Sequence, residues 1–491
     1  MVAALWLLAP TSMYADGGKR EFRGAWMQFV NGMYLGKSTA EIQQMLTHQL
    51  DELEKDGANA IIFQVRGECD ALYESKIEPW SRYLTGVQGK APSPYWDPMA
   101  WMIQQCHRRG MEFHAWINPY RARMKSPTRL ADNHILKTHP ERAFEYGGLY
   151  VLNPGLKENR DYILSVVDDI VSRYDIDGIH IDDYFYPYPE GGRPIPDDRE
   201  YALYNNGIAD RGDWRRYNVN LFVKEMGEHV HKLKPWVKFG VSPFGIYRSK
   251  KSSPIGSDTN GLQNYDQLYA DVLLWVNNGW IDYCVPQLYW HIGHPLADYE
   301  KLIKWWAKHM ANRPLYIGES IENTVQNSDP ANPNTHQMAA KFRLHRQLRN
   351  VSGTVLWYAK VAAEDMGSYG TMLRNVYWKS KALPPYMPFL DSKAPKKPAK
   401  VGDAWTEDGL MLYWSAPKAK KWGDEARRYV IYRFAKGEKV NLADASKIVK
   451  ITYDNYYRLP YDGGTKKYKY VVTALDRVGN ESKGAKRKVK L

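Results

Sequence analysis

The chain has 491 residues, which is too long for one ordinary domain and predicts at least two. With 44% hydrophobic and 25% charged residues, its composition is typical of a globular protein and excludes an intrinsically disordered chain. The formal net charge is +13, yet no basic stretch has the pattern of a nucleic-acid-binding module, so we expect no nucleic-acid partner. The 18 Trp and 36 Tyr residues suit carbohydrate binding and protein interfaces, although a large barrel also needs bulky filling residues.

The first residues form a short apolar run from Val2 to Ala9, followed by small and polar residues. This run is too short to span a bilayer and resembles the hydrophobic core of a secretory signal, with a cleavage position after Ala15. We therefore interpret residues 1–18 as the remnant of a signal peptide. The localisation that follows is periplasmic, secreted or at the cell surface.

Residues 19–383 alternate short apolar runs with longer segments of helical periodicity. The apolar runs are typical of parallel strands that are covered on both faces. Ser38 and Gly57 bound the first predicted helix, and Asp97 and Gly110 bound the second. Eight strand–helix units predict an α/β fold, a (β/α)8 TIM barrel; an open doubly wound sheet is disfavoured because no glycine-rich phosphate loop follows the first strand. The expected strands are residues 22–29, 60–66, 112–118, 178–184, 237–244, 281–289, 314–320 and 353–359.

Proline and lysine are concentrated in residues 384–399, which predicts a linker. In residues 400–491 helical periodicity is absent, and short runs alternate apolar with polar residues. This pattern predicts a small all-β sandwich that resembles a fibronectin type III module, with Trp414 in its core and Tyr468 near a tyrosine-corner position. No catalytic group is evident there, so we expect the module to position the barrel or to associate with a cell wall or surface.

Two adjacent carboxylates, Asp182 and Asp183, end the fourth predicted strand. Barrel enzymes carry their catalytic groups at the C-terminal ends of the strands. Two close carboxylates repel each other, which raises one pKa and favours one protonated group beside one anion. Such a pair suits acid–base chemistry. Alternatively, Asp182 could cap the next segment while Asp183 accepts a backbone hydrogen bond.

Other strand ends contribute the amides, rings and charges that are typical of a sugar-binding site. Simpler roles also exist for them, because Arg66 could pair with Glu68, His114 could lie satisfied inside the barrel, and the tryptophans could fill it. Glu319, at the end of the seventh strand, is a further candidate acid. The residues expected to contact the substrate are Gln64, Arg66, Glu68, His114, Trp116, Asn118, Arg121, Tyr184, Gln287, Tyr289, Trp290 and Trp357.

Neither the histidines nor the cysteines have the spacing of a metal site. The three cysteines, Cys69, Cys106 and Cys284, occupy positions that suit small buried hydrophobic residues. We therefore expect no metal, no other cofactor and no disulfide.

Several motifs in order resemble the bacterial glycosyl-hydrolase-like family ten, over roughly residues 20–380. This resemblance implies a TIM-barrel glycoside hydrolase that is exported and acts on an N-acetylated polysaccharide. The family includes an enteric, division-associated hydrolase of peptidoglycan strands, so the implied substrate is bacterial cell-wall glycan. The motifs are "RGAWM", "HRRGMEFHAWINPYR", "LNPG", "YDIDGIHIDDYFYP", "FGVSPFGIYR", "NNGWIDYCVPQLYW" and "LYIGES".

The resemblance also implies a mechanism. The adjacent aspartates are similar to those of O-GlcNAc-hydrolase-type barrels, in which one acid orients the acetamide of the substrate as nucleophile and the other protonates the leaving oxygen. By this analogy Asp182 polarises the acetamide, Asp183 is the general acid/base, with the order of the two roles left open, and Tyr289 steadies the acetamide. The alternatives are a two-carboxylate retaining glycosidase, with Asp182 or Asp183 as nucleophile and Glu319 as acid, and a non-catalytic glycan-binding surface protein.

Overall fold

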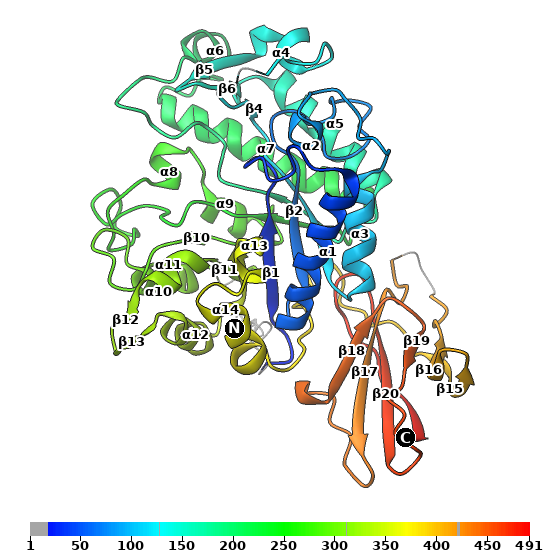
Figure 1. Cartoon of the computed structure of the whole chain (residues 1–491). Coiled ribbons are helices and arrows are strands. Elements are labelled where there is room, and N and C mark those ends of the chain that lie inside the picture. The colour runs from blue at the N-terminus through cyan, green and yellow to red at the C-terminus, as the bar shows by residue number, and fades with distance from the viewer. Residues whose placement is uncertain (1–17, 127, 311, 420–422) are drawn as a thin grey trace, which may run out of the picture.

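The computed structural model describes residues 18–126, 128–310, 312–419 and 423–491. Parallel strands at eight positions close into a barrel, as predicted (Figure 1). The ring closes where the last strand, β14, pairs with β1, while β11 pairs with β14, β10 and β9. The sixth position consists of two short strands rather than one, because Pro286 between them has no N–H to donate to the ladder. The strands are β1 (Phe22–Met27), β2 (Ala60–Arg66), β3 (Glu112–Ile117), β7 (Gly178–Ile181), β8 (Lys238–Val241), β9 (Tyr283–Cys284), β10 (Gln287–Leu288), β11 (Leu315–Ser320) and β14 (Val351–Trp357).

Helices cover the outside of the barrel (Figure 1). The first begins with a capping box between Ser38 and Glu41 and ends at Gly57, whose φ is 97°. The second begins where the Asp97 side chain accepts a hydrogen bond from the Ala100 N–H. The main helices are α1 (Thr39–Asp56), α3 (Pro98–Arg108), α5 (Lys157–Arg173), α7 (Arg211–Leu233), α9 (Val272–Asn277), α10 (Tyr299–His309), α12 (Met338–Gln347), α13 (Ala359–Ala363) and α14 (Tyr369–Met372).

Shorter elements occupy the connections between strands and helices. The largest excursion follows β3 and contains a three-stranded antiparallel sheet in the order β4-β6-β5. These elements are α2 (Arg82–Thr85), β4 (Arg121–Arg123), α4 (Ile135–Thr138), β5 (Ala143–Tyr146), β6 (Leu149–Leu152), α6 (Asp198–Tyr204), α8 (Asn264–Gln267), α11 (Ile321–Gln326), β12 (Ser328–Asp329) and β13 (Asn332–His336).

Two antiparallel sheets form the predicted C-terminal sandwich. Trp414 is 4% exposed and lies in the core between the sheets, and Tyr468 packs against that core. One sheet contains β15 (Ala399–Thr406), β16 (Gly409–Ser415) and β19 (Tyr456–Arg458), in that order. The other contains β18 (Ile448–Thr452), β17 (Arg428–Ala435), β20 (Lys467–Leu475) and β21 (Ala485–Lys490), in that order.

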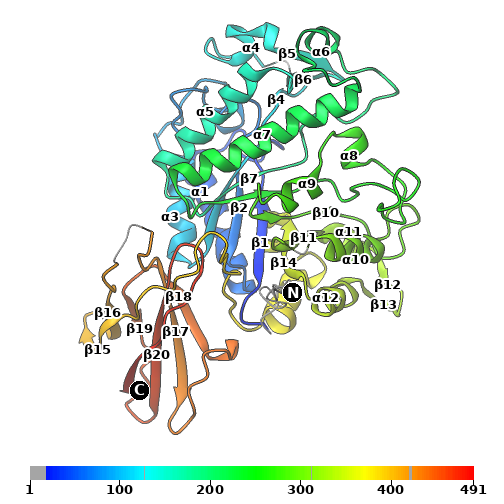
Figure 2. The same ribbon diagram turned by 180° about the vertical axis from the view of Figure 1, so that it is seen from behind.

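The sandwich packs against the N-terminal end of the barrel (Figures 1 and 2). Arg428, at the start of β17, donates a hydrogen bond of 2.7 Å to Glu112, at the start of β3. Lys238, at the start of β8, donates to the same carboxylate at 2.6 Å, and all three side chains are buried. Gly110 lies directly beneath the sandwich, since a Cβ atom there would come within 2.5 Å of the carbonyl oxygen of Ile451. The contact is therefore both charged and tightly packed.

A column of buried polar side chains runs through the barrel interior. His114 contacts Glu112 at 3.1 Å through Nε2 and the Tyr283 hydroxyl at 2.7 Å through Nδ1. The same hydroxyl lies 3.1 Å from Nδ1 of His180, whose Nε2 lies 2.9 Å from the Ser242 hydroxyl. The column joins the end of the barrel that faces the sandwich to the opposite end.

No helix in the described ranges is both long and apolar enough to cross a membrane. The three cysteines are buried and form no disulfide. The predicted signal-peptide remnant lies, apart from Gly18, outside the described residues.

Candidate active site

A cavity of about 550 Å³ opens at the C-terminal ends of the barrel strands. Asp182 and Asp183, which directly follow β7, lie in its wall. Ten residues that the sequence placed at this end line the cavity together. They are Gln64, Trp116, Arg121, Asp182, Asp183, Tyr184, Gln287, Tyr289, Trp290 and Trp357.

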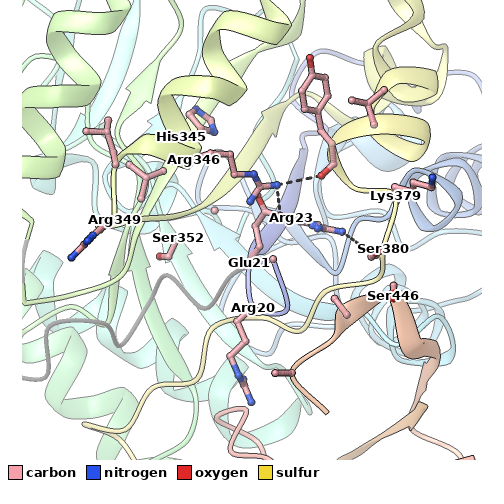
Figure 3. Close-up of a pocket in the computed structure, with 18 of the residues that line it drawn as sticks. Arg20, Glu21, Arg23, His345, Arg346, Arg349, Ser352, Lys379, Ser380 and Ser446 are labelled. Atoms are coloured by element: carbon pink, nitrogen blue, oxygen red, sulfur yellow. Dashed lines mark hydrogen bonds and ion pairs between the residues drawn. The ribbon is translucent and has the colours of Figure 1, made fainter. Parts of the chain in front are cut away.

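A second cavity, of about 770 Å³, lies at the opposite end of the barrel, beside the sandwich (Figure 3). The charged residues of its wall are mainly basic and include Arg20, Arg23, Arg346 and Arg349. The carboxylate of Glu21 is held between the Arg23 Nε atom, at 2.8 Å, and the Arg346 Nη1 atom, at 2.9 Å. An acid neutralised in this way suits no proton transfer, so the cavity with the aspartate pair is the candidate active site.

Asp182 is 3% exposed, and its two oxygens have different surroundings. Its Oδ2 accepts hydrogen bonds from Trp116 Nε1, at 3.1 Å, and from Asn118 Nδ2, whereas Oδ1 has no hydrogen-bond partner within the described residues. Burial, and next the neighbouring Asp183, raise the pKa of Asp182 to about 7, while Arg121 acts in the opposite direction. Asp182 can therefore hold a proton on Oδ1 near neutral pH.

Asp183 is 1% exposed and has a donor at each oxygen. Gln287 Nε2 donates to Oδ1 at 3.0 Å, and the Tyr188 hydroxyl donates to Oδ2. The pKa of Asp183 is raised above its ordinary value by burial, although these two hydrogen bonds act in the opposite direction and limit the rise. Because both donors stabilise the charged form, Asp183 is the member of the pair that is better suited to remain an anion.

Asn118 lies behind Asp182 and fixes its orientation. The Oδ1 atom of Asn118 accepts hydrogen bonds from Gln64 Nε2, at 2.7 Å, and from Arg121 Nη2. Since both donors occupy the oxygen, the amide nitrogen faces Asp182. Arg121 also places its guanidinium 5.2 Å from the centre of the Tyr184 ring.

Aromatic rings form the remainder of the cavity wall. Trp357 stacks with Tyr289 at 5.8 Å between ring centres, and it meets Trp26 and Trp116 edge to face at 6.1 and 6.4 Å. Rings that combine a flat apolar face with a polar edge suit a sugar, whose ring carbons form an apolar face bordered by hydroxyl groups.

Two expected residues of the second strand lie outside the cavity. The register between β2 and β3 shifts after Gln64, so Arg66 does not share the orientation of Gln64. Arg66 is fully buried and donates to both oxygens of Glu78 at 2.7 to 2.9 Å. Glu68 is 1% exposed and pairs with Arg82 at 3.0 Å. Both side chains stabilise the loop after β2 rather than facing a substrate.

Two further candidates are also directed elsewhere. His114 belongs to the polar column in the barrel interior, below the cavity. Along β11, Gly318 faces the interior, where a Cβ atom would lie 3.0 Å from Trp26, so the next residue, Glu319, faces outward. There Glu319 is 1% exposed and forms an ion pair with Lys341. An outward, paired Glu319 gives no support to its role as catalytic acid.

Several lining residues were not expected from the sequence. Trp26, on β1, and Gln28, just after the end of β1, both line the cavity, and this alternation is a signal that could have identified Trp26. Tyr188 lies in a loop, where no periodic pattern predicts the direction of a side chain. Phe244 is the last residue of the expected strand 237–244 and forms an isolated β-bridge with Gln287.

Among the described residues, no group of three or more His, Cys, Asp or Glu side chains could hold a metal ion. The cavity wall offers carboxylates, amides and aromatic rings.

Comparison with known sequences gives two kinds of match. The family described as Glycosyl hydrolase-like 10 matches residues 21–334. The chain is 39% identical over 483 residues to "Glycosyl hydrolase YngK" of Bacillus subtilis (strain 168), covering 96% of this chain and 94% of that protein. It is 36% identical over 332 residues to "Glycosyl hydrolase DigH" of Escherichia coli (strain K12), covering 64% of this chain and 75% of that protein.

Solved structures give weaker matches. The glycoside hydrolase domain of PgaB (BpsB) from Bordetella bronchiseptica is 10% identical, with a TM-score of 0.46, covering 72% of this chain and 98% of that chain. The α-L-fucosidase isoenzyme 2 from Paenibacillus thiaminolyticus has the same identity and TM-score, covering 72% of this chain and 49% of that chain.

Proposed function

Because this chain belongs to the glycosyl hydrolase-like family 10 and is a glycoside hydrolase, we propose that it cleaves an N-acetylated cell-wall polysaccharide at the aspartate pair. The single observation that supports this site best is the unequal hydrogen bonding of the two carboxylates. One aspartate has an oxygen without a partner and a pKa of about 7, and the other accepts a donor at each oxygen. A proton donor and an anion therefore stand side by side in a cavity lined with aromatic rings.

In the proposed reaction, Asp182 is the general acid and Asp183 the anion that orients the substrate. This is the reverse of the order given first by the family analogy, and the hydrogen bonds of the free enzyme are what favour it. The Asp182 proton passes to the leaving oxygen as the glycosidic C–O bond breaks. The acetamide oxygen of the sugar that loses the leaving group forms a bond to the anomeric carbon of that sugar. Asp183 accepts a hydrogen bond from the acetamide N–H.

Water completes the reaction by attacking the anomeric carbon, which breaks the bond between that carbon and the acetamide oxygen, and the water gives a proton back to Asp182. Tyr289 lies in the cavity wall, where its hydroxyl would donate to the acetamide oxygen. We further propose that the substrate is peptidoglycan strand and that the protein works outside the cytoplasm, in the periplasm, at the surface or in the medium. The apolar run at residues 2–9 supports export.

The test compares Asp182→Asn and Asp183→Asn with the wild type. The substrates are peptidoglycan strands without stem peptides, chitin oligomers, and an aryl N-acetylglucosaminide whose leaving group needs no proton. New reducing ends are identified by mass spectrometry. Loss of a general acid should lower turnover of the polymer by about 100-fold or more, while Asp182→Asn should keep activity on the aryl glycoside.

Asp183→Asn should lose activity on every substrate, because the acetamide is no longer oriented. The control is Asp161→Asn, at an exposed carboxylate on α5, which should behave as the wild type. If Asp183→Asn alone retained the aryl glycoside activity, the two roles would be reversed. Wild-type turnover of the polymer in both variants would remove the aspartate pair from the mechanism altogether.

A further inference from the structure

The three-stranded sheet of the sandwich has one face in the core and one face open to solvent. On β16, Leu410, Leu412 and Trp414 are buried, so the alternate residues Met411 and Tyr413 point outward. The contacts with the barrel come instead from the four-stranded sheet and its loops. Both views place β15 and β16 on the side of the sandwich away from the barrel (Figures 1 and 2).

Two tyrosines lie side by side on this open face. Tyr413 pairs directly with Tyr456 of β19 across the antiparallel ladder, so both rings point outward. Tyr413 is 45% exposed and Tyr456 is 53% exposed. The Tyr413 ring lies across the backbone of Gly402, because a Cβ atom there would stand 2.5 Å from the tyrosine hydroxyl oxygen. The absence of a side chain at Gly402 lets this ring lie flat on the sheet.

A second pair of rings stands at the end of the same sheet. Trp405, on β15, is 62% exposed and meets Tyr461 edge to face at 4.8 Å. Among the described residues of the sandwich, the exposed large apolar side chains are these four rings, and none of them is aliphatic. Trp405 pairs with the buried Leu410, so its ring lies on the other side of the sheet from Tyr413 and Tyr456, and the second pair is not part of the open face. Exposed rings that lie side by side, as Tyr413 and Tyr456 do, are typical of a binding surface.

We propose that the open face carrying Tyr413 and Tyr456 binds a polysaccharide strand. The polymer is the peptidoglycan that the proposed function assigns to the barrel, on which this inference rests, and its carboxylate groups make it acidic. The apolar face of a sugar ring would stack on the tyrosines, and their hydroxyl groups would bond its rim. Arg458 lies opposite Met411 on the same face and adds a cation. The charge is complementary, since residues 400–491 contain 21 Lys and Arg but 11 Asp and Glu.

This face is separate from the catalytic cavity. The sandwich packs on the N-terminal end of the barrel and the aspartate pair lies at the other end, a strand length of roughly 20 Å away or more. A short oligosaccharide cannot occupy both places, but a polymer network can. The face would therefore hold the enzyme on its polymer without taking part in cleavage.

The experiment uses the full chain carrying Asp183→Asn, so that the polymer is not consumed during binding. Added to it are Tyr413→Thr and Tyr456→Thr, which remove the rings but keep residues that favour strands. Affinity for insoluble peptidoglycan and for uncharged chitin is measured by co-sedimentation at low and high salt. The matched control is Tyr150→Thr, at an exposed tyrosine on β6 of the three-stranded sheet that follows β3.

The ring-free variant should bind peptidoglycan about tenfold more weakly than its parent, with the control unchanged. Equal affinity of the variant and its parent for peptidoglycan would overturn the proposal. The proposal would also be overturned if high salt abolished binding to the same extent in both proteins, because the rings would then contribute nothing. In an Asp183-containing background, the ring-free variant should cleave soluble short oligosaccharides at the wild-type rate. The cleavage assay and the binding assay test the two proposals separately. If the protein cleaves none of the substrates, the proposed function is wrong. The co-sedimentation assay tests only whether the open face of the sheet binds the polymer.

Discussion

At the scale of single residues, the two neighbouring aspartates are distinguished by the groups behind them. Asp182 is held through one oxygen by Trp116 and Asn118, and Asp183 is held through both by Tyr188 and Gln287. The sequence places the pair at a strand end, but it contains no sign of Tyr188, which lies in the loop that follows. The division of roles therefore depends on a residue that only the fold brings to the site.

Tyr188→Phe should move the acidic limb of the pH profile of kcat/KM. The hydroxyl donates to Asp183 and lowers its pKa, so removing it raises that pKa and shifts the limb to higher pH. The alkaline limb should stay near pH 7, because it reports loss of the Asp182 proton. Initial rates on a soluble oligosaccharide between pH 4 and 9 measure both limbs. Tyr184→Phe is the control, and an acidic limb that moved equally in both variants would contradict the role of this hydrogen bond.

At the scale of elements, successive side chains of a strand point alternately into and out of the barrel. This alternation explains which of the expected site residues reach the cavity. Trp116 and Asp182 project toward the barrel axis at the top of their strands, and the apolar pattern around them predicts both positions. Gly318 faces the barrel interior, so the next residue, Glu319, faces the surrounding helices. The alternation of side chains along β11, starting from Gly318, would have indicated this direction. Arg66 follows a register shift, which no pattern in the sequence reveals. The barrel was predictable because burial on both faces leaves continuous apolar runs, whereas shifts and loops leave no such trace.

Gly110 ends α3 and also touches the sandwich, so Gly110→Ala should destabilise the chain by about 2 kcal/mol or more. Its φ of 76° is unfavourable for alanine by about 1 kcal/mol, and the new Cβ would collide with the Ile451 carbonyl oxygen. Urea unfolding followed by circular dichroism gives the difference. Gly86→Ala is a matched control, because Gly86 has a φ of 84° but no atom within 4 Å of an added Cβ. An equal decrease in the free energy of unfolding in the two variants would show that the sandwich does not restrict the space around Gly110.

At the scale of the whole molecule, buried charges join the two domains. Burial alone would raise the pKa of Glu112, but Lys238 and then Arg428 outweigh it and lower the pKa to about 2, from an ordinary value of 4.5. A carboxylate whose pKa is depressed by folding contributes stability above its unfolded pKa. That stability is lost as the pH falls from about 4.5 toward 2. Acid should therefore loosen the junction between barrel and sandwich.

Arg428→Met removes the sandwich's partner of this carboxylate and should cost about 3–5 kcal/mol, because a buried charge loses one of its two counterions. Acid unfolding should then begin at a higher pH than in the wild type. Thermal melts between pH 3 and 7 measure both effects. Arg487→Met, which breaks an exposed pair with Asp403, is the control and should cost less than about 1 kcal/mol. A Tm for Arg428→Met as high as that of this control would rule out an energetic role for the junction.

The polar column inside the barrel limits how this scaffold can be redesigned. Each member of the column is a hydrogen-bond partner of its neighbours, from Glu112 through His114, Tyr283 and His180 to Ser242. An apolar replacement of one member therefore leaves the groups on either side of it buried without a hydrogen-bond partner. Library screens that vary one position at a time will therefore find the axis intolerant, even where hydrophobic cores elsewhere accept change. Successful variants of the axis should arise only when adjoining members are exchanged together.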